Sequence, residues 1–339
     1  MDNRGLTGAT YVRRTVRAST ATGLIVALVA FAAAGCGGRP AATPATPSPC
    51  VSSDLSLSLG VMGVGLGNVE TWIIATNRSG KTCELAGYPA IRLEDAHHRS
   101  QTAVVRRGST YFATDPGAHP IFLAPGAKAI ANLAWNDNPA QGEPQTGGCV
   151  PPTAWLAIIP PGTAVPIRAR FGTGSGVAVC GRRLDVSAFQ LVRLTPTGVG
   201  NAQFGADKAM AVRQLRDLFG APTGRGVNSG CGPAYTEVVW GDLAAEFRRD
   251  VFTGYRFISG GYPFSTSATR PRGVVRPVAP TLGAEGGITI GSTVAKLRTT
   301  YRSLTTIGTE RRRSGKGLVF RDNGGGPIVE IKTGTCGDF

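Results

Sequence analysis

Residues 75 to 82 of this chain, ATNRSGKT, carry the Gly-Lys-Thr and the four-residue gap of a phosphate-binding loop, with alanine where that loop begins with glycine. Such a loop requires a helix directly after its threonine, because the amides at the helix N-terminus hold the phosphate. Here Cys83, Gly87 and Pro89 follow instead. We therefore interpret the segment as the polar turn of a hairpin.

The histidines of the chain are His97, His98 and His119. Adjacent residues of a strand point to opposite faces, so His97 and His98 are poorly placed to bind one metal ion together. The pair stands in the polar segment EDAHHRS, which is typical of a loop. The sequence therefore predicts no metal site.

Other catalytic patterns are incomplete. The chain has no Gly-x-Ser-x-Gly elbow, and the glycines of residues 60–68 lack the spacing of a dinucleotide fingerprint. Glu94, Asp95 and Asp137 fit solvated loops, although a glycosidase-type carboxylate pair stays open. We predict no catalytic residue and no cofactor.

The N-terminus has the features of an export signal. Four arginines precede an uncharged stretch, Ala18 to Gly35, whose centre is apolar and whose end has small residues. Residues 33–36, Ala-Ala-Gly-Cys, resemble the lipobox of bacterial lipoproteins. The resemblance implies that residues 1–35 are removed and that Cys36 carries a lipid. The alternative is an uncleaved membrane helix, but the strongly apolar part, Leu24 to Ala34, is shorter than the roughly 18 to 20 residues needed to span a bilayer.

Residues 36–49 are rich in proline, alanine and threonine, which predicts an extended tether. The net charge of the whole chain is +15, and removing four arginines and Asp2 with the leader lowers it to +12. No aromatic-interleaved motif accompanies the basic residues, so we expect no nucleic-acid partner. The charge favours an anionic wall polymer, a lipid or an envelope protein as the partner. Basic residues that only solvate the surface would explain it equally well.

Strands and turns fill the region after the tether. Residues 164–171, AVPIRARF, place Val165, Ile167, Ala169 and Phe171 on one face, and residues 128–135, KAIANLAW, alternate similarly. No convincing amphipathic helix occurs between residues 51 and 195, which favours an antiparallel, immunoglobulin-like β-sandwich over residues 50–195. The four tryptophans stand in apolar runs and are predicted to be core residues rather than sugar-binding platforms: Trp72, Trp135, Trp155 and Trp240.

This region is similar to a sandwich domain of unknown function that is common in actinobacterial lipoproteins. The resemblance rests on the Asn-x-Ser-Gly-x-x-Cys-x-Leu-x-Gly-Tyr-Pro run, residues 77–89, and on the Pro-Gly before the alanine-rich strand. It covers roughly residues 50–192. It implies an exported, membrane-anchored location and assigns no catalytic residue.

Residues 200–339 predict an α+β domain. Asp207 can begin a helix that buries Ala211, Leu215, Leu218 and Phe219, and a second helix fits after Ser292-Thr293 with Val294, Leu297, Tyr301 and Leu304 as its apolar stripe. An offset of 86 residues superimposes the two patterns, which indicates an internal duplication. Each helix precedes hairpin sequences, TEVVWGDLAAEF and GLVFRDNGGGPIVEIK. In outline this resembles the tandem-repeat β-lactamase inhibitor proteins, a comparison of architecture only.

Six cysteines remain beside Cys36: Cys50, Cys83, Cys149, Cys180, Cys231 and Cys336. An even number without a C-x-x-C pair in an exported chain predicts three disulfides rather than zinc or redox chemistry. Fifteen pairings are possible, and the division into two domains favours Cys50 with Cys83, Cys149 with Cys180, and Cys231 with Cys336.

Together these features predict a mainly β, lipid-anchored protein on the extracytoplasmic face of the cell membrane that acts as a non-catalytic binding module. Two alternatives stay open. One is an extracytoplasmic inhibitor or sensor that uses the duplicated sheet, and the other is a cell-wall hydrolase, which a cleft with two facing carboxylates would favour.

Overall fold

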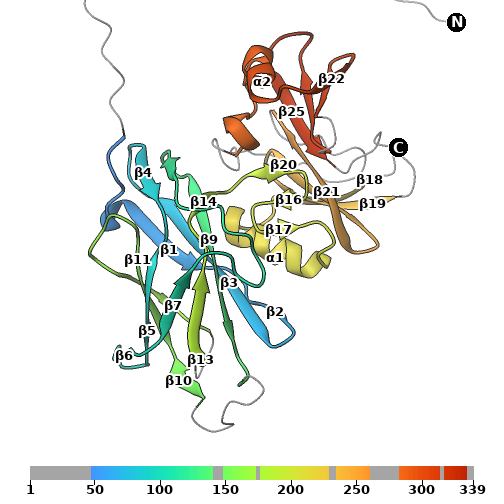
Figure 1. Cartoon of the computed structure of the whole chain (residues 1–339). Helices are drawn as coiled ribbons and strands as arrows, with labels where there is room; N and C mark the ends of the chain where they lie inside the picture. Colours follow the sequence, from blue (N-terminus) through green and yellow to red (C-terminus); the bar gives the residue numbers. More distant parts are fainter. Residues whose placement is uncertain are drawn as a thin grey trace, which may run out of the picture. The chain divides into compact units, whose positions relative to one another are not determined.

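The computed structural model of the protein describes residues 47–139, 148–172, 176–228, 234–259, 282–313 and 317–333. These residues all belong to one compact unit, which runs from Thr46 to Phe339. Strands dominate the described part, and its α-helices, α1 (Lys208–Phe219) and α2 (Val294–Thr300), are short (Figure 1). The prediction of a mainly β protein is confirmed. Neither described helix has the length and hydropathy that a bilayer crossing requires.

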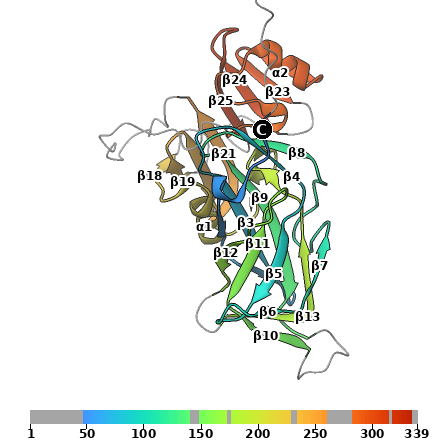
Figure 2. The ribbon, with the colours of Figure 1, turned by 90° about the vertical axis from the view of Figure 1, so that its left-hand side faces the viewer.

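Two sheets enclose the first hydrophobic core. In the described residues, the larger sheet has the order β1-β3-β9-β13-β10, with β2, β7 and β14 paired alongside, and the smaller sheet has the order β12-β11-β5-β6 (Figures 1 and 2). Leu133 of the larger sheet and Leu156 of the smaller one are fully buried in the same core, as expected of a sandwich. The strands of the larger sheet are β1 (Leu55–Leu59), β2 (Gly63–Gly65), β3 (Asn68–Asn77), β7 (Val104–Arg107), β9 (Lys128–Asn136), β10 (Cys149–Thr153), β13 (Val177–Val186) and β14 (Gln190–Leu191). Those of the smaller sheet are β5 (Ala90–Glu94), β6 (Ser100–Gln101), β11 (Trp155–Ile159) and β12 (Ile167–Arg170).

The sandwich departs from the purely antiparallel prediction at β7. This strand pairs with β13 in the parallel sense, with Val104 opposite Arg183. A parallel pair requires a long crossover, and between β7 and β13 the chain runs through β8 (Pro120–Leu123) and then through β9, β10, β11 and β12. The parallel pairing therefore joins segments far apart in the sequence, which local patterns do not specify.

The two central strands of the larger sheet are buried on both faces. On β9, Ala129, Ala131 and Leu133 face the sandwich core as the alternation predicts, but Ile130 on the opposite face is also 1% exposed. On β3 the same holds for Ile74, which packs in a second core with residues of α1. These strands therefore read as nearly continuous apolar runs because both of their faces are covered.

The strand predicted in AVPIRARF begins only at Ile167, three residues after the start of that run. Val165 is 62% exposed and lies before β12, whereas Ala169 and Phe171 are buried as expected. Pro166 has no amide hydrogen for a sheet ladder, so the strand starts directly after it.

A duplicated unit follows the connecting strands β15 (Leu194–Thr195), β16 (Gly198–Val199) and β17 (Ala202–Gln203). Helix α1 precedes the antiparallel strands β18 (Gly224–Asn228), β19 (Tyr235–Trp240), β20 (Leu243–Arg248) and β21 (Val251–Ile258). Helix α2 precedes β22 (Leu304–Ile307), β23 (Glu310–Arg313), β24 (Val319–Asp322) and β25 (Ile328–Thr333). In the described residues the eight strands form one sheet in which the last strands of the two repeats, β21 and β25, pair at the centre.

Equivalent residues of the repeats have the same local structure. The N-cap side chains are Asp207 and Thr293, 86 positions apart, as predicted. The Gly205 amide donates to Phe252 O over 2.9 Å, and the Gly291 amide donates to Ile328 O over 2.8 Å, so each repeat ties its helix to the first residues of its fourth strand in the same way. Helix α2 lies against its own strands (Figure 2).

Helix α2 is shorter than its apolar stripe predicts. It ends at Thr300, Tyr301 is its C-cap, and Leu304 already begins β22. The hydroxyls of Thr299 and Thr300 both donate to Lys296 O, and such local bonds with two β-branched residues weaken a helix. Leu297 and Tyr301 are buried as predicted.

Candidate functional site

The described cysteines form the predicted disulfides. Cys50 is bonded to Cys83, and Cys149 is bonded to Cys180, its direct partner across β10 and β13. Both bonds link segments of the sandwich. The predicted lipidation site Cys36 and the predicted pair Cys231 and Cys336 lie outside the described residues, so those predictions stand as predictions.

The segment that resembles a phosphate-binding loop is a turn without a helix after it. Strand β3 ends at Asn77, and β4 (Cys83–Ala86) pairs with β8 rather than with β3, so the turn connects two sheets instead of closing a hairpin. The buried side chain of Asn77 holds the turn: its Nδ2 donates to Lys81 O over 2.8 Å, and its Oδ1 accepts from the Ser79 amide over 2.9 Å. The polar residues of this segment therefore stabilise the turn by hydrogen bonds within it.

The three histidine side chains do not share one site. His97 is exposed, the Nδ1 of His98 lies 3.2 Å from Glu94 Oε2, and the Nδ1 of His119 lies 2.9 Å from Gly117 O. Within the part of the chain that the structure describes, no group of three histidine, cysteine or acidic side chains has the geometry of a metal site.

The acidic residues of the EDAHHRS segment have separate structural tasks. Asp95 lies in a polar loop as predicted, and its Oδ1 accepts hydrogen bonds from the backbone amides of His97 and Arg99. Glu94 differs from the prediction, since it belongs to β5 and is 3% exposed. Asp137 is exposed, and Asn138 donates to it.

One of the four tryptophans lies outside the hydrophobic cores. Trp72, Trp135 and Trp240 are buried as predicted, but Trp155 is half-buried on the outward face of the smaller sheet. Across the strands, Trp155 lies opposite Glu94 of β5 and Arg170 of β12. Ala157, two residues further along β11, lies opposite Arg92 and Arg168. These residues share one face, because side chains alternate along a strand. We call this face, with His98 from the adjacent loop, the Trp155 surface: Arg92, Glu94, His98, Trp155, Arg168 and Arg170.

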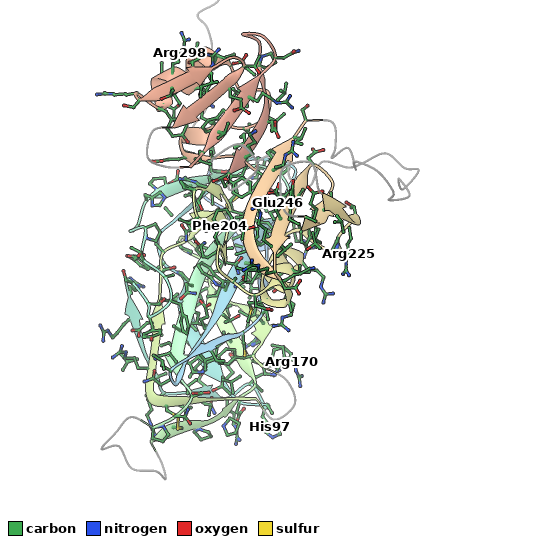
Figure 3. All side chains as sticks on the ribbon, turned by 90° about the vertical axis from the view of Figure 1, so that its right-hand side faces the viewer. His97, Arg170, Phe204, Arg225, Glu246 and Arg298 are labelled. Carbon is green, nitrogen blue, oxygen red and sulfur yellow. A yellow bond between two sulfur atoms is a disulfide. The ribbon has the colours of Figure 1, made fainter. Side chains whose placement is uncertain are left out.

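Ring and cation contacts shape the Trp155 surface. The Arg170 guanidinium carbon lies 5.5 Å from the centroid of the Trp155 ring, and the His98 ring centroid lies 5.1 Å from it. Figure 3 shows Arg170 projecting from the sandwich, with His97 of the neighbouring loop on the same side. A cation over an indole face is held by the quadrupole of the ring, so Arg170 is pre-positioned.

Positive charge exceeds negative charge on this surface. Glu94 accepts from Arg168 Nε over 2.8 Å and from a second guanidinium nitrogen over 3.3 Å, and this bond holds the pKa of the Glu94 carboxyl below its usual value. Arg92 and Arg170 make no ion pair with any carboxylate in the described ranges. The Arg170 guanidinium therefore lies over a half-exposed indole ring, and a second unpaired guanidinium, that of Arg92, belongs to the same face.

A pair of facing carboxylates lies in the duplicated sheet. Glu237 of β19 and Glu246 of β20 are direct cross-strand partners, and each is 3% exposed. Burial raises the pKa of Glu246 to about 8, with Glu237 adding to the effect, and Glu246 Oε1 has no hydrogen-bond partner among the described residues. The pair does not line either of two pockets near residues 191–194. Figure 3 labels Glu246 within the sheet.

The sandwich corresponds to a known sequence family. Residues 50–190 match the domain of unknown function DUF4232. The DUF4232 domain thus contains both described disulfides and the whole Trp155 surface. Comparison with curated proteins gives no match, and comparison with solved structures gives none.

Two features of the sequence could have indicated these clusters. Arg168 and Arg170 alternate with apolar residues, so they mark the outward face of a strand, but their partner Trp155 had to be placed by the fold. Glu237 and Glu246 stand at equal distances from the predicted Gly241-Asp242 turn, and hairpin register alone places them opposite each other.

Proposed function

We propose that this protein is a membrane-anchored lipoprotein of the cell envelope that acts as a non-catalytic binding module on the outer face of the cytoplasmic membrane. Its DUF4232 domain would bind an anionic wall polymer at the Trp155 surface. The observation that carries the proposal is the half-exposed Trp155 ring under Arg170, on a surface where neither Arg92 nor Arg170 has a carboxylate partner in the described residues.

The export part of the proposal rests on cysteine chemistry. Disulfides persist in oxidising compartments, and the DUF4232 domain holds two of them. The basic and apolar leader before Cys36 supplies the signal, and the proline-rich segment after it supplies a tether. Two acyl chains hold a protein stably on a membrane, where one gives marginal binding.

The ligand part rests on the chemistry of the Trp155 surface. An anionic polymer offers repeated charges to Arg92 and Arg170, and the apolar face of a sugar ring can pack on the free part of the indole ring. Each contact on an exposed surface is weak, so affinity has to come from repetition along the polymer. A polymer therefore fits this surface better than a small anion.

The anchor is tested by intact mass. We expect the protein purified from membranes of its native host to begin at Cys36 and to carry at least two acyl chains. A Cys36→Ala chain should keep residues 1–35 and lack the acyl mass. A native chain that retains residues 1–35 without acyl groups would contradict the anchor.

The Trp155 surface is tested by binding to a polyuronate of defined length, with neutral dextran as the comparison. We expect polyuronate binding that weakens with added salt, and we expect Arg170→Gln and Trp155→Ala each to weaken it about three- to tenfold, because each removes half of the cation–ring contact. Titration calorimetry of the full chain would measure this.

The matched control for the Trp155 surface is Arg302→Gln, which removes an exposed arginine after α2. It lowers the net charge equally and should leave polyuronate binding unchanged. Equal losses in Arg170→Gln and Arg302→Gln would mean that net charge alone attracts the polymer, and the Trp155 surface would then have no specific role. Binding to anionic vesicles that exceeds binding to the polymer would assign the surface to lipid instead.

A further inference from the structure

Two neighbouring pockets lie where the DUF4232 domain passes into the duplicated unit. The first has a volume of about 230 Å³ and is lined by Ile130 of β9, Leu194 of β15 and Leu318 before β24, among others. The second has a volume of about 240 Å³ and is lined largely by residues 283–289. Both pockets share Leu191 and Arg193, so we treat them together as the junction pockets.

Hydrogen-bonded backbone forms the walls of the junction pockets. The Leu194 amide donates to Gly283 O over 2.9 Å, and the Gly200 amide donates to Arg193 O over 2.9 Å. On the other side, the hydroxyl of Tyr255 donates to Thr195 O over 2.9 Å. The connector that carries Arg193 is therefore fixed on both sides, so the pockets are formed before any ligand arrives.

The floor of the first pocket is apolar. Ile130, Leu194 and Leu318 are each 1% exposed, and they belong to the sandwich, the connector and the second repeat in turn. Gly200 also lines this pocket, and a Cβ placed there would come within 2.8 Å of Leu218 Cδ1, so the close approach of the chain depends on this glycine. An apolar ligand segment is the chemistry that such a floor accepts.

Arg193 lines both pockets. The guanidinium of Arg193 makes no hydrogen bond or ion pair to any residue in the described ranges, and the same holds for the side-chain amide of Gln190. Glu285 lines the first pocket only and has an interaction partner of its own. An arginine keeps its charge at every physiological pH, so Arg193 offers a permanent fork of donors to an anion.

We propose that the junction pockets bind a small amphiphilic carboxylate, with its apolar chain on the floor of the first pocket and its carboxylate on Arg193. A cavity of about 150 Å³ holds benzene, which has six carbons, so the first pocket has room for on the order of six to nine carbons. Arginine matches a carboxylate with two parallel hydrogen bonds, which fixes the orientation of the ligand.

This site is independent of the Trp155 surface. The Trp155 surface lies on the smaller sheet of the sandwich, whereas the junction pockets are lined by β9, β14, the connector and the second repeat. The two proposals differ in ligand as well, since one takes a polymer and the other takes a single small molecule.

The test is titration calorimetry of the purified full chain with octanoate, after subtraction of a detergent blank. We expect saturable binding of one octanoate per chain, and at least tenfold weaker binding of octanol, because octanol lacks the charge that pairs with Arg193. Arg193→Gln should weaken octanoate binding at least tenfold and leave octanol binding unchanged. Leu191→Trp, which fills space in both pockets, should weaken both ligands.

Three comparisons make the result decisive. Arg302→Gln and Arg170→Gln should bind octanoate as the unaltered chain does, so a failed Trp155 surface would leave this result untouched. If Arg193→Gln keeps full octanoate affinity, if octanol binds as tightly as octanoate, or if no saturable binding occurs in a chain that unfolds cooperatively, the proposal is overturned. A thermal unfolding curve for each variant shows that it is folded.

Discussion

Glu246 behaves unlike a glutamate in water because the duplicated sheet surrounds it. In the part of the chain that the structure describes, its Oε1 has no hydrogen-bond partner, Glu237 lies directly opposite, and burial raises its pKa from 4.5 to about 8. Between these two pH values the native carboxyl keeps a proton that the unfolded chain has released. The native state then binds more protons than the unfolded state, so the free energy of unfolding falls as the pH rises through this window.

Glu246→Gln should remove this pH dependence, since glutamine mimics the protonated acid and does not titrate. At pH 5 we expect the variant and the unaltered chain to differ little. Toward pH 8 the unaltered chain should lose on the order of 3 to 5 kcal/mol more than the variant, as follows from a pKa raised from 4.5 to about 8. Urea unfolding of the full chain at pH 5, 6.5 and 8 would measure the difference.

The control for this prediction is Glu84→Gln on β4, a half-buried glutamate of the sandwich. The free energy of unfolding of this variant should change with pH as that of the unaltered chain does. A Glu246→Gln profile that also runs parallel to that of the unaltered chain would show that Glu246 is ionised in the native state, which would contradict the prediction.

At the scale of elements, the duplication is visible in the backbone as well as in the helix patterns. Gly205 and Gly291 are 86 positions apart and have φ angles of 89° and 86°. Each glycine lies two residues before a helix N-cap and donates its amide to the start of the fourth strand of its own repeat. Both repeats therefore need a left-handed residue at the same point, and glycine adopts that conformation without strain.

Gly205→Ala and Gly291→Ala should each lower the free energy of unfolding by about 1 to 2 kcal/mol. A Cβ at either position would meet no atom within 4 Å, so the cost is backbone strain rather than a clash. Chemical denaturation would measure it, and Gly205→Asn and Gly291→Asn should recover part of the loss because asparagine tolerates the left-handed region.

Gly80→Ala is the matched control for the two glycines. Gly80 also has open space around a Cβ, but its φ is not in the left-handed region, so the change should stay within about 0.5 kcal/mol. Equal costs at all three positions would mean that the paired glycines are not conformationally required. The inferred equivalence of the repeats at this point would then fail.

At the scale of the whole molecule, the DUF4232 domain and the duplicated unit share a core. Ile74 of β3 and Ile130 of β9 pack in one cluster with Leu215 and Leu218 of α1. Polar contacts join the same surfaces: the Lys128 ammonium donates to Leu218 O, and the Val61 amide donates to Asp217 Oδ2 over 2.7 Å. Helix α1 therefore packs on one face of the larger sheet and also belongs to the core of its own repeat.

Ile74→Ala and Ile73→Ala test this shared core, because these neighbours lie on opposite faces of β3. Each side chain is buried, so each variant should lose about 2 to 5 kcal/mol. We expect faster amide hydrogen exchange in α1 for Ile74→Ala and little change there for Ile73→Ala, which packs in the sandwich core. Equal protection of α1 in both variants would contradict the shared core.

Short-range spacing determined much of this structure in advance. The strand alternation of residues 128–135, the Gly241-Asp242 turn and the N-cap at Asp207 each depend on a few neighbouring residues, and each lies where its pattern predicts. The 86-residue offset also predicted equivalent helix starts. These features are local because backbone conformation and side-chain period are set within one turn or one strand.

Only the tertiary structure decided which surfaces meet. Trp155 stands in an apolar run of the sequence, as the other tryptophans do. It nevertheless faces outward, because the sandwich core lies on the other side of β11. The parallel pairing of β7, the second buried face of β3 and β9, and the junction pockets all join segments more than 50 residues apart. Such contacts depend on the packing of whole elements, for which a local pattern contains no information. The sequence by itself therefore predicted the helix starts, the repeat and the pairing of the described disulfides, whereas the packing of the sheets decided the Trp155 surface and the junction pockets.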